Sequence, residues 1–420
     1  MYEYNFKDKR KKIEDILNNS LEERKQKYYE ELKIYDKQNL YDDKKSYSDK
    51  LVKKKKIIIK NLNLDKINKE KEYIELENES KIKFQTFLNS AFGLFDMTSS
   101  SIHKNIYNIK FEYVIFKDCV FKNINFEECV FIGCEFIGCK FFYVKFKKSD
   151  LFDFESKCSV YFYSSNLENC TFERSNLKRN IFQLAELKNT RFMLCNLRKS
   201  IFDQNTIESL YISDCDLKSF AMINTYAKKL EFDDDFLTKL NEYSFFDKFT
   251  MDKKDKEEYT NLSKIYKDIA SKFESNRILG ISGEYHYLYK CSQEKTLKSF
   301  SKLKSQIIWS ICGYGEKPIY SLITSFEIIL VFAIIYLFTG INVGDRQINY
   351  DLSIFFMLDK KIIIVDFLES LYFSLVTFTT VGYGDIIPTG ISIVLSSIEM
   401  ILGVTMVGIW TATLARKITR

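Results

Sequence analysis

Large apolar residues recur at every fifth position between residues 106 and 217, a spacing that neither an α-helix nor a β-strand produces. One run goes from Ile106 to Leu151, and after a slip of one residue a second run goes from Leu167 to Leu217. A period of five needs a short straight segment and a corner in each unit. Four units then close a square coil of about twenty residues, and successive coils stack about 4.8 Å apart. The pattern predicts a β-solenoid with a bulge or a small inserted loop between Leu151 and Leu167.

Small residues recur two positions before the large ones, and they mark a second inward position where space is limited. Seven of the ten cysteines occupy this position: Cys119, Cys129, Cys134, Cys139, Cys170, Cys195 and Cys215. Cysteine pairs that bind zinc usually lie about two to four residues apart, whereas these cysteines follow the repeat. The spacing therefore favours packing over a metal or redox cluster.

This alternation of small, variable and Phe or Leu residues resembles the pentapeptide-repeat family. The resemblance implies a right-handed four-sided β-helix over residues 106–220. Some members of that family mimic DNA and inhibit topoisomerases, which requires a strongly acidic surface. Residues 106–220 carry 16 basic and 15 acidic side chains, so we expect a rigid stalk or an interaction surface instead.

The segments on either side of the repeat are polar and partly helical. Residues 1–105 are crowded with charges and turn aromatic near their end, which predicts a partly helical region and a cap for the β-helix. Residues 221–318 form a linker in which 252–273 and about 284–291 have apolar residues at helical spacing. We interpret this pair as a helical hairpin.

A further helix is predicted at 297–311, where apolar residues at helical spacing are accompanied by lysines and by Trp309. This combination suits a helix on the inner membrane surface, with lysines at the lipid headgroups and tryptophan in the interface. The alternative is a soluble amphipathic helix that packs on the β-helix.

Two apolar segments near the C-terminus, Ile319–Gly340 and Gly390–Leu414, are each long enough to cross a bilayer. The stretch 367–379 between them is too short to span, and Asp366 with Glu369 resembles a capping box at the start of a short helix. The lysines and arginines that flank the spans are Lys295, Lys298, Lys302, Lys304, Lys317, Arg416, Lys417 and Arg420. The positive-inside rule then places both termini in the cytosol.

The short helix leads directly into Thr380-Val381-Gly382-Tyr383-Gly384-Asp385. Backbone carbonyls can replace the water shell of potassium only if successive carbonyls point the same way. This requires backbone angles that glycine tolerates and other residues avoid. The run resembles the selectivity filter of the potassium channel family at all six positions. A second run, Gly313-Tyr314-Gly315-Glu316, has no apolar helix before it, and we interpret it as a hinge.

The resemblance implies roles for further residues. Filter coordination is expected from Thr380, Val381, Gly382, Tyr383 and Gly384, and filter support from Asp385, Tyr372, Phe373 and Thr379. Tyr372 and Phe373 stand where family members often carry adjacent tryptophans. Gly403 and Gly408 are candidate gating hinges in the inner helix. Glu399 is an acid inside the second span, which would either line the cavity or hydrogen-bond behind the pore helix.

Together these patterns predict a multidomain chain: the β-helix, an α-helical linker, and an all-α two-helix potassium channel pore over 319–420. A ring of carbonyls needs several chains, so we expect a homotetramer. The predicted function is a potassium-selective channel whose cytosolic repeat domain regulates or anchors the pore. The alternatives are a less selective cation channel, or a membrane-anchored adaptor for a cytosolic partner.

Composition narrows these predictions only slightly. The net charge of +6 is small against 63 basic and 57 acidic residues and gives no case for nucleic acid. No catalytic constellation, cofactor motif or metal site other than the potassium filter emerges, so we expect no enzyme. The N-terminus has no apolar core of signal-peptide length, and the chain ends soon after the second span, so gating is expected from the N-terminal side. The expected partners are K⁺, lipids and an unidentified cytosolic protein, and the expected location is the inner membrane of a bacterium with an AT-rich genome.

Overall fold

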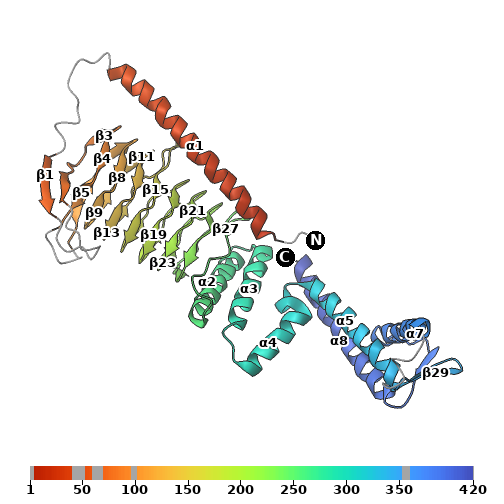
Figure 1. Cartoon of the computed structure of the whole chain (residues 1–420). Helices are drawn as coiled ribbons and strands as arrows, with labels where there is room; N and C mark the ends of the chain where they lie inside the picture. Colours follow the sequence, from red (N-terminus) through yellow and green to blue (C-terminus); the bar gives the residue numbers. More distant parts are fainter. Residues whose placement is uncertain (1–3, 40–52, 59–69, 96–101, 352–359, 420) are drawn as a thin grey trace. The chain divides into compact units, whose positions relative to one another are not determined.

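The computed structural model describes residues 4–39, 53–58, 70–95, 102–351 and 360–419. The chain divides into two compact units, Met1–Tyr285 and His286–Arg420. The first unit is a four-sided β-solenoid, the pentapeptide-repeat fold, and it confirms the period of five (Figure 1). The second unit holds the apolar helices.

The faces of the solenoid are sheets of short strands. One face has the order β1 (Lys53–Ile58), β2 (Glu70–Glu75), β5 (Ser90–Gly93), β9 (Val120–Lys122), β13 (Lys140–Phe142), β16 (Asn166–Glu168), β19 (Glu186–Lys188), β22 (Thr206–Ile207) and β25 (Tyr226–Ala227). The second has β26 (Leu230–Phe232), β23 (Leu210–Ser213), β20 (Thr190–Met193), β17 (Thr171–Glu173), β14 (Lys145–Lys147), β10 (Ile124–Glu127) and β6 (Lys104–Tyr107).

The third face has the order β27 (Phe245–Phe246), β24 (Ala221–Ile223), β21 (Ile201–Asp203), β18 (Ile181–Gln183), β15 (Tyr161–Tyr163), β12 (Glu135–Ile137), β8 (Ile115–Lys117) and β4 (Thr86–Leu88). The fourth has β11 (Val130–Ile132), β7 (Lys110–Glu112) and β3 (Lys81–Lys83), and isolated bridges at Asp150, Asn176, Asn196 and Asp216 continue it. Strand pairing is parallel throughout the solenoid except between β1 and β2.

The core of the solenoid is a set of stacked aromatic rings. Phe121 pairs with Phe141 across one coil, an offset of 20 residues, and their ring centroids lie 4.8 Å apart. Where the sequence slips, the offset grows to 26 residues, so that Phe136 pairs with Phe162. The insertion is a small loop closed by an antiparallel bridge between Phe152 and Ser159. The slip was therefore located correctly.

The inward cysteines are packing residues. Their side chains are buried, and several thiols donate to a backbone carbonyl, as Cys139 does to Phe116 at 3.2 Å. Burial raises the pKa of Cys129 to about 11 and that of Cys134 to about 12. Because the thiolate is the reactive form, Cys129 and Cys134 are poor nucleophiles and poor metal ligands. Among the described residues, no group of three or more His, Cys, Asp or Glu could hold a metal ion.

The solenoid extends beyond residues 106–220. Strands of the same sheets begin at Lys53, with β1 and β2, and continue to Phe246. The helix α1 (Phe6–Asn39) lies along the strand stack (Figure 1). Leu17 on α1 is buried against Ile181 and Ile201 of the third face. The N-terminal region thus contributes a helix along one side as well as the first coils.

The linker contains three helices: α2 (Lys256–Ser275), α3 (Leu279–Glu294) and α4 (Ser299–Cys312). Asp255 caps α2, because its side chain accepts a hydrogen bond from the Glu258 backbone N–H. α4 has no buried residue, and its Phe300 side chain is 82 % exposed. A turn of 3-10 helix, Gly313–Gly315, separates α4 from the next helix.

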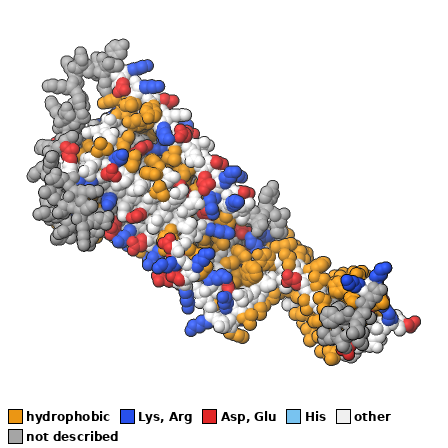
Figure 2. All heavy atoms as spheres, viewed as in Figure 1, with side chains coloured by type: hydrophobic (Ala, Val, Ile, Leu, Met, Phe, Trp, Pro, Cys, Tyr) orange, Lys and Arg blue, Asp and Glu red, His pale blue; other side chains and the backbone are white. Residues whose placement is uncertain are grey.

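The second unit contains two helices long and apolar enough to cross a membrane, α5 (Pro318–Thr339) and α8 (Ser392–Ile418). Between them lie α7 (Lys360–Phe378) and a small antiparallel sheet of β29 (Arg346–Ile348), β28 (Ile341–Val343) and β30 (Ile386–Pro388). Figure 2 shows hydrophobic side chains gathered over these helices, while the visible solenoid surface mixes both signs of charge.

Candidate functional site: the segment between α7 and β30

The segment Thr380–Asp385 connects the C-terminal end of α7 to β30. Its backbone alternates: φ is +61° at Thr380, +55° at Gly382 and +79° at Gly384, while Val381 and Tyr383 have no positive φ. Left-handed angles at every second residue are the unusual geometry that the glycine spacing predicts. The sequence did not predict the left-handed angle at Thr380, because this conformation is strained for a β-branched residue.

Three contacts hold the ends of this segment. The Thr380 N–H donates to the Thr377 carbonyl at 3.0 Å, and the Val381 N–H donates to the Val376 carbonyl at 3.0 Å, so its start continues from the last turn of α7. At the other end, the Tyr372 hydroxyl lies within hydrogen-bonding reach of the Asp385 carboxylate. Phe373, its neighbour, is buried and packs edge-on against Tyr336 of α5, with ring centroids 4.9 Å apart.

Large side chains of the segment remain uncovered in the single chain. Val381 is 52 % exposed and Tyr383 is 72 % exposed. Thr379, the last expected support residue, uses its hydroxyl to donate to the Leu375 carbonyl at 2.7 Å. The single chain thus orients the backbone of the segment but leaves two of its apolar side chains without cover.

Glu399 lies behind α7, and its side chain is fully buried. Tyr336 of α5 donates its hydroxyl proton to Glu399 Oε2 at 2.6 Å, and the Ser374 hydroxyl of α7 donates to Glu399 Oε1. The carboxylate therefore joins the two candidate spans to α7. The sequence left two alternatives for Glu399, lining a cavity or hydrogen-bonding behind the short helix, and the structure favours the second. Sequence spacing could not have identified Tyr336 and Ser374 as the donors.

We expect Glu399→Leu to lower the thermal stability of the purified protein. Leucine is of similar size but accepts no hydrogen bond, so the buried Tyr336 and Ser374 hydroxyls would lose an acceptor. Each such loss costs about 1–3 kcal/mol. Glu399→Gln keeps one acceptor oxygen and should lose less. Glu327 of α5 is exposed, so Glu327→Leu is the matched control and should leave the unfolding midpoint nearly unchanged. An unaltered midpoint for Glu399→Leu would count against this role.

Gly403 of α8 is in close contact with α7. A Cβ at this position would lie 1.9 Å from the carbonyl oxygen of Phe378, which is two residues before Thr380. Gly408, the other candidate hinge, has open space around the same position. α8 is one continuous helix through both glycines.

The capping-box prediction for Asp366 and Glu369 is wrong. α7 begins at Lys360, six residues earlier than Asp366, so Asp366 lies inside the helix and is buried. Its carboxylate accepts hydrogen bonds from Arg346 Nη1 at 2.6 Å and from the Tyr350 hydroxyl, and Arg346 Nη2 contacts Glu369. These acids bind the loop that follows α5 instead of the helix N-terminus.

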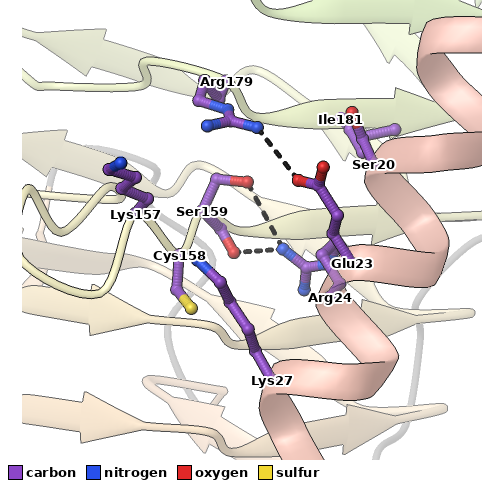
Figure 3. A pocket seen from close by; sticks show the side chains of 9 residues that line it. All are labelled: Ser20, Glu23, Arg24, Lys27, Lys157, Cys158, Ser159, Arg179 and Ile181. Atoms are coloured by element: carbon purple, nitrogen blue, oxygen red, sulfur yellow. Dashed lines mark hydrogen bonds and ion pairs between the residues drawn. The ribbon is translucent and has the colours of Figure 1, made fainter.

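A separate small pocket lies where α1 meets the inserted loop of the solenoid (Figure 3). Arg24 donates to the Ser159 carbonyl and Lys27 to the Ser156 carbonyl, while Arg179 pairs with Glu23 at 3.4 Å. α1 thus supplies donors to carbonyls of the irregular loop. The cavity has a volume of about 20 Å³, room for about one water molecule, so we assign it a structural role.

Two family matches coincide with these two parts. The ion channel family matches residues 346–420, and eight copies of the pentapeptide repeat match residues 111–153 and 161–198. The chain joins a pentapeptide-repeat domain to an ion channel domain. The gap between the two repeat matches coincides with the inserted loop. Together with α5 and α8, the ion channel match indicates a membrane protein, and neither family is one of enzymes.

The solved structures that are similar to this chain include two pentapeptide-repeat proteins, HetL and Rfr23. Full-length QnrB1, a plasmid-mediated fluoroquinolone resistance protein, is 15% identical, with 40% of this chain and 86% of that chain covered and a TM-score of 0.20. HetL from the cyanobacterium Nostoc, which is involved in heterocyst differentiation regulation, is 12% identical, with 39% and 86% covered and a TM-score of 0.13. Rfr23 from the cyanobacterium Cyanothece is 13% identical, with 36% and 87% covered and a TM-score of 0.10. No curated protein matches the chain.

Proposed function

We propose that four copies of this chain form a potassium-selective channel in a cell membrane, with Thr380–Gly384 as the ion-coordinating filter. α5 and α8 cross the membrane, and α7 enters it from one side only. The pentapeptide-repeat domain stays in the cytosol and regulates or anchors the pore. The ions in the filter are the only ligand that this function requires.

The alternating backbone of the filter segment is the observation that supports this proposal most directly. The backbone has left-handed angles at Thr380, Gly382 and Gly384 and no positive φ between them, an alternation that would allow successive carbonyls to face the same side. Carbonyl rings that replace the hydration shell are the means by which potassium filters select their ion. The C-terminal end of α7, negative by its dipole, leads into this segment and favours a cation there.

The uncovered side chains support the tetramer. Val381 and Tyr383 are more than half exposed in the single chain, although both are large and apolar in character. Neighbouring copies around a fourfold axis would cover such side chains while leaving the carbonyls free to face the axis. The exposed apolar face of α8, which includes Ile401, Val404 and Val407, would be covered in the same assembly.

The test is ion flux through purified full-length protein in liposomes. We expect a potassium gradient to drive flux and a sodium gradient to drive far less. Tyr383→Ala should lose the difference between the two ions. Tyr243, a solenoid tyrosine with 75 % exposure against 72 % for Tyr383, provides the matched control. Tyr243→Ala should conduct like the unmodified protein. Absent flux, or equal flux of sodium and potassium, would overturn the proposal.

A further inference from the structure

The Gly313-Tyr314-Gly315-Glu316 turn connects α4 to α5. It carries left-handed backbone angles at three successive residues: φ is +52° at Gly313, +57° at Tyr314 and +80° at Gly315. Tyr314 adopts this strained conformation while its hydroxyl lies 2.9 Å from the Ser305 hydroxyl of α4. A strained backbone angle of this kind persists only where the surrounding structure holds it in place.

The turn buries a carboxylate between two other elements. The Glu316 side chain is only 1 % exposed, and its Oε1 lies 3.4 Å from Nη2 of Arg416 in the last turn of α8. The same oxygen lies 3.4 Å from Nδ1 of His286 on α3. A buried carboxylate without a cationic partner costs several kcal/mol. Glu316 therefore ties α3 and the end of α8 to the start of α5.

A second observation places the end of α8 on this turn. A Cβ at Gly315 would lie 3.2 Å from Nη1 of Arg416. The guanidinium group of Arg416 therefore lies next to Gly315 and contacts Glu316. The glycine supplies both the left-handed angle and the space for the arginine, so Gly315 and Glu316 form one receptacle for Arg416.

We propose that the Gly313–Glu316 turn is a docking site for the cytosolic end of α8, and that Glu316, Arg416 and His286 act as positioning residues that couple α3 to the pore. This rests on the proposed channel function. α8 follows Thr380–Asp385 after the short strand β30, and Arg416 in its last turn contacts Glu316. The division between the two compact units falls inside α3, at Tyr285 and His286. Because the chain passes from the solenoid unit to the pore unit through α3, a movement of α3 reaches α8 through Glu316.

The experiment is a double-mutant cycle on channel opening in the full-length protein. Glu316→Gln and Arg416→Gln are recorded singly and together in planar bilayers. Each single substitution should change the ratio of open to closed times about fivefold or more, and the double variant should change it no further. Arg416→Lys, which keeps the charge, should restore part of the effect. Glu274→Gln, the same substitution at an exposed glutamate of α2, should have no effect.

A second measurement separates this proposal from the proposed channel function. Hydrogen–deuterium exchange on the purified full-length protein reports whether the last turns of α8 are held. We expect Glu316→Gln and Arg416→Gln to speed exchange over residues 411–418, and Glu274→Gln to leave it unchanged. If no ions pass but exchange responds in this way, the channel function fails and the docking site stands. If ions pass but the two substitutions act additively or leave exchange unaltered, the docking site is overturned.

Discussion

Alanine at position 382 is expected to abolish the preference for potassium over sodium. Gly382 has a φ of +55°, and apart from its chain neighbours no atom of the chain lies within 4 Å of a Cβ built on it. Glycine is therefore required at position 382 because of the backbone angle, since a larger side chain would have enough space. A left-handed conformation costs an L-residue about 1–2 kcal/mol, and a tetramer carries that cost four times in one ring. The backbone should relax and turn a carbonyl away from the axis.

The matched control for this substitution is Gly344, in the turn between β28 and β29. Its φ is +58° and the space around it is equally open, but it lies outside the filter. Gly344→Ala therefore imposes the same backbone cost without touching the carbonyl ring. We expect it to keep the selectivity of the unmodified channel. Reversal potentials under opposed potassium and sodium gradients measure the difference. A Gly382→Ala channel that folds and still excludes sodium would contradict the filter assignment.

The solenoid was predictable because one local rule repeats. A large inward residue at every fifth position fixes both the strand register and the stacking, as the pairs Phe121–Phe141 and Phe126–Phe146 show. The extra coils carried the same signal in weaker form. Ile82, Phe87 and Phe92 are five apart before the main run, and Met222 and Ala227 continue it after Leu217. The small Ala227 hid the pattern at the C-terminal end.

The inserted loop shows where this rule ends. The slip in the repeat located the insertion. It did not indicate which side chains donate hydrogen bonds to the backbone carbonyls of the inserted loop. The donors come from Arg24 and Lys27 on α1, more than a hundred residues away in sequence. The charged pattern of α1 predicted a helix, but a helix surface does not reveal the carbonyls against which it will pack.

The second unit has the same limit. The motif of the candidate filter is local, so its glycines could be located from the sequence alone. The partners of Glu399 and Asp366 come from other elements, and their geometry depends on how α5, α7 and α8 pack. The short helix was predicted to begin near Asp366 because an acid followed by another three residues later fits a capping box. Tertiary contacts with Arg346 explain that pair instead.

The second large effect is expected at Gly403, where a hinge and a close contact predict different results. If Gly403 served only as a hinge, Gly403→Ala would leave a folded tetramer with altered opening. The structure places a Cβ at this position 1.9 Å from the Phe378 carbonyl oxygen, a distance that backbone atoms cannot tolerate. Alanine must therefore push α8 away from α7 immediately below Thr380. Overpacking of this kind costs about 1–3 kcal/mol per site, repeated in every subunit.

We accordingly expect Gly403→Ala to lower the melting temperature of the purified protein and, in the proposed channel, to reduce potassium flux. Gly408 is the matched control on the same helix, since a Cβ there meets nothing within 4 Å. Alanine is favoured over glycine in a helix by about 1 kcal/mol, so Gly408→Ala should be as stable as the unmodified protein or more so. A stable Gly403→Ala tetramer with changed opening would instead support the hinge. Gly403 and Gly408 both lie in α8, but only Gly403 is in close contact with another helix. Comparing the two alanine variants therefore distinguishes a requirement for close packing from a requirement for helix bending.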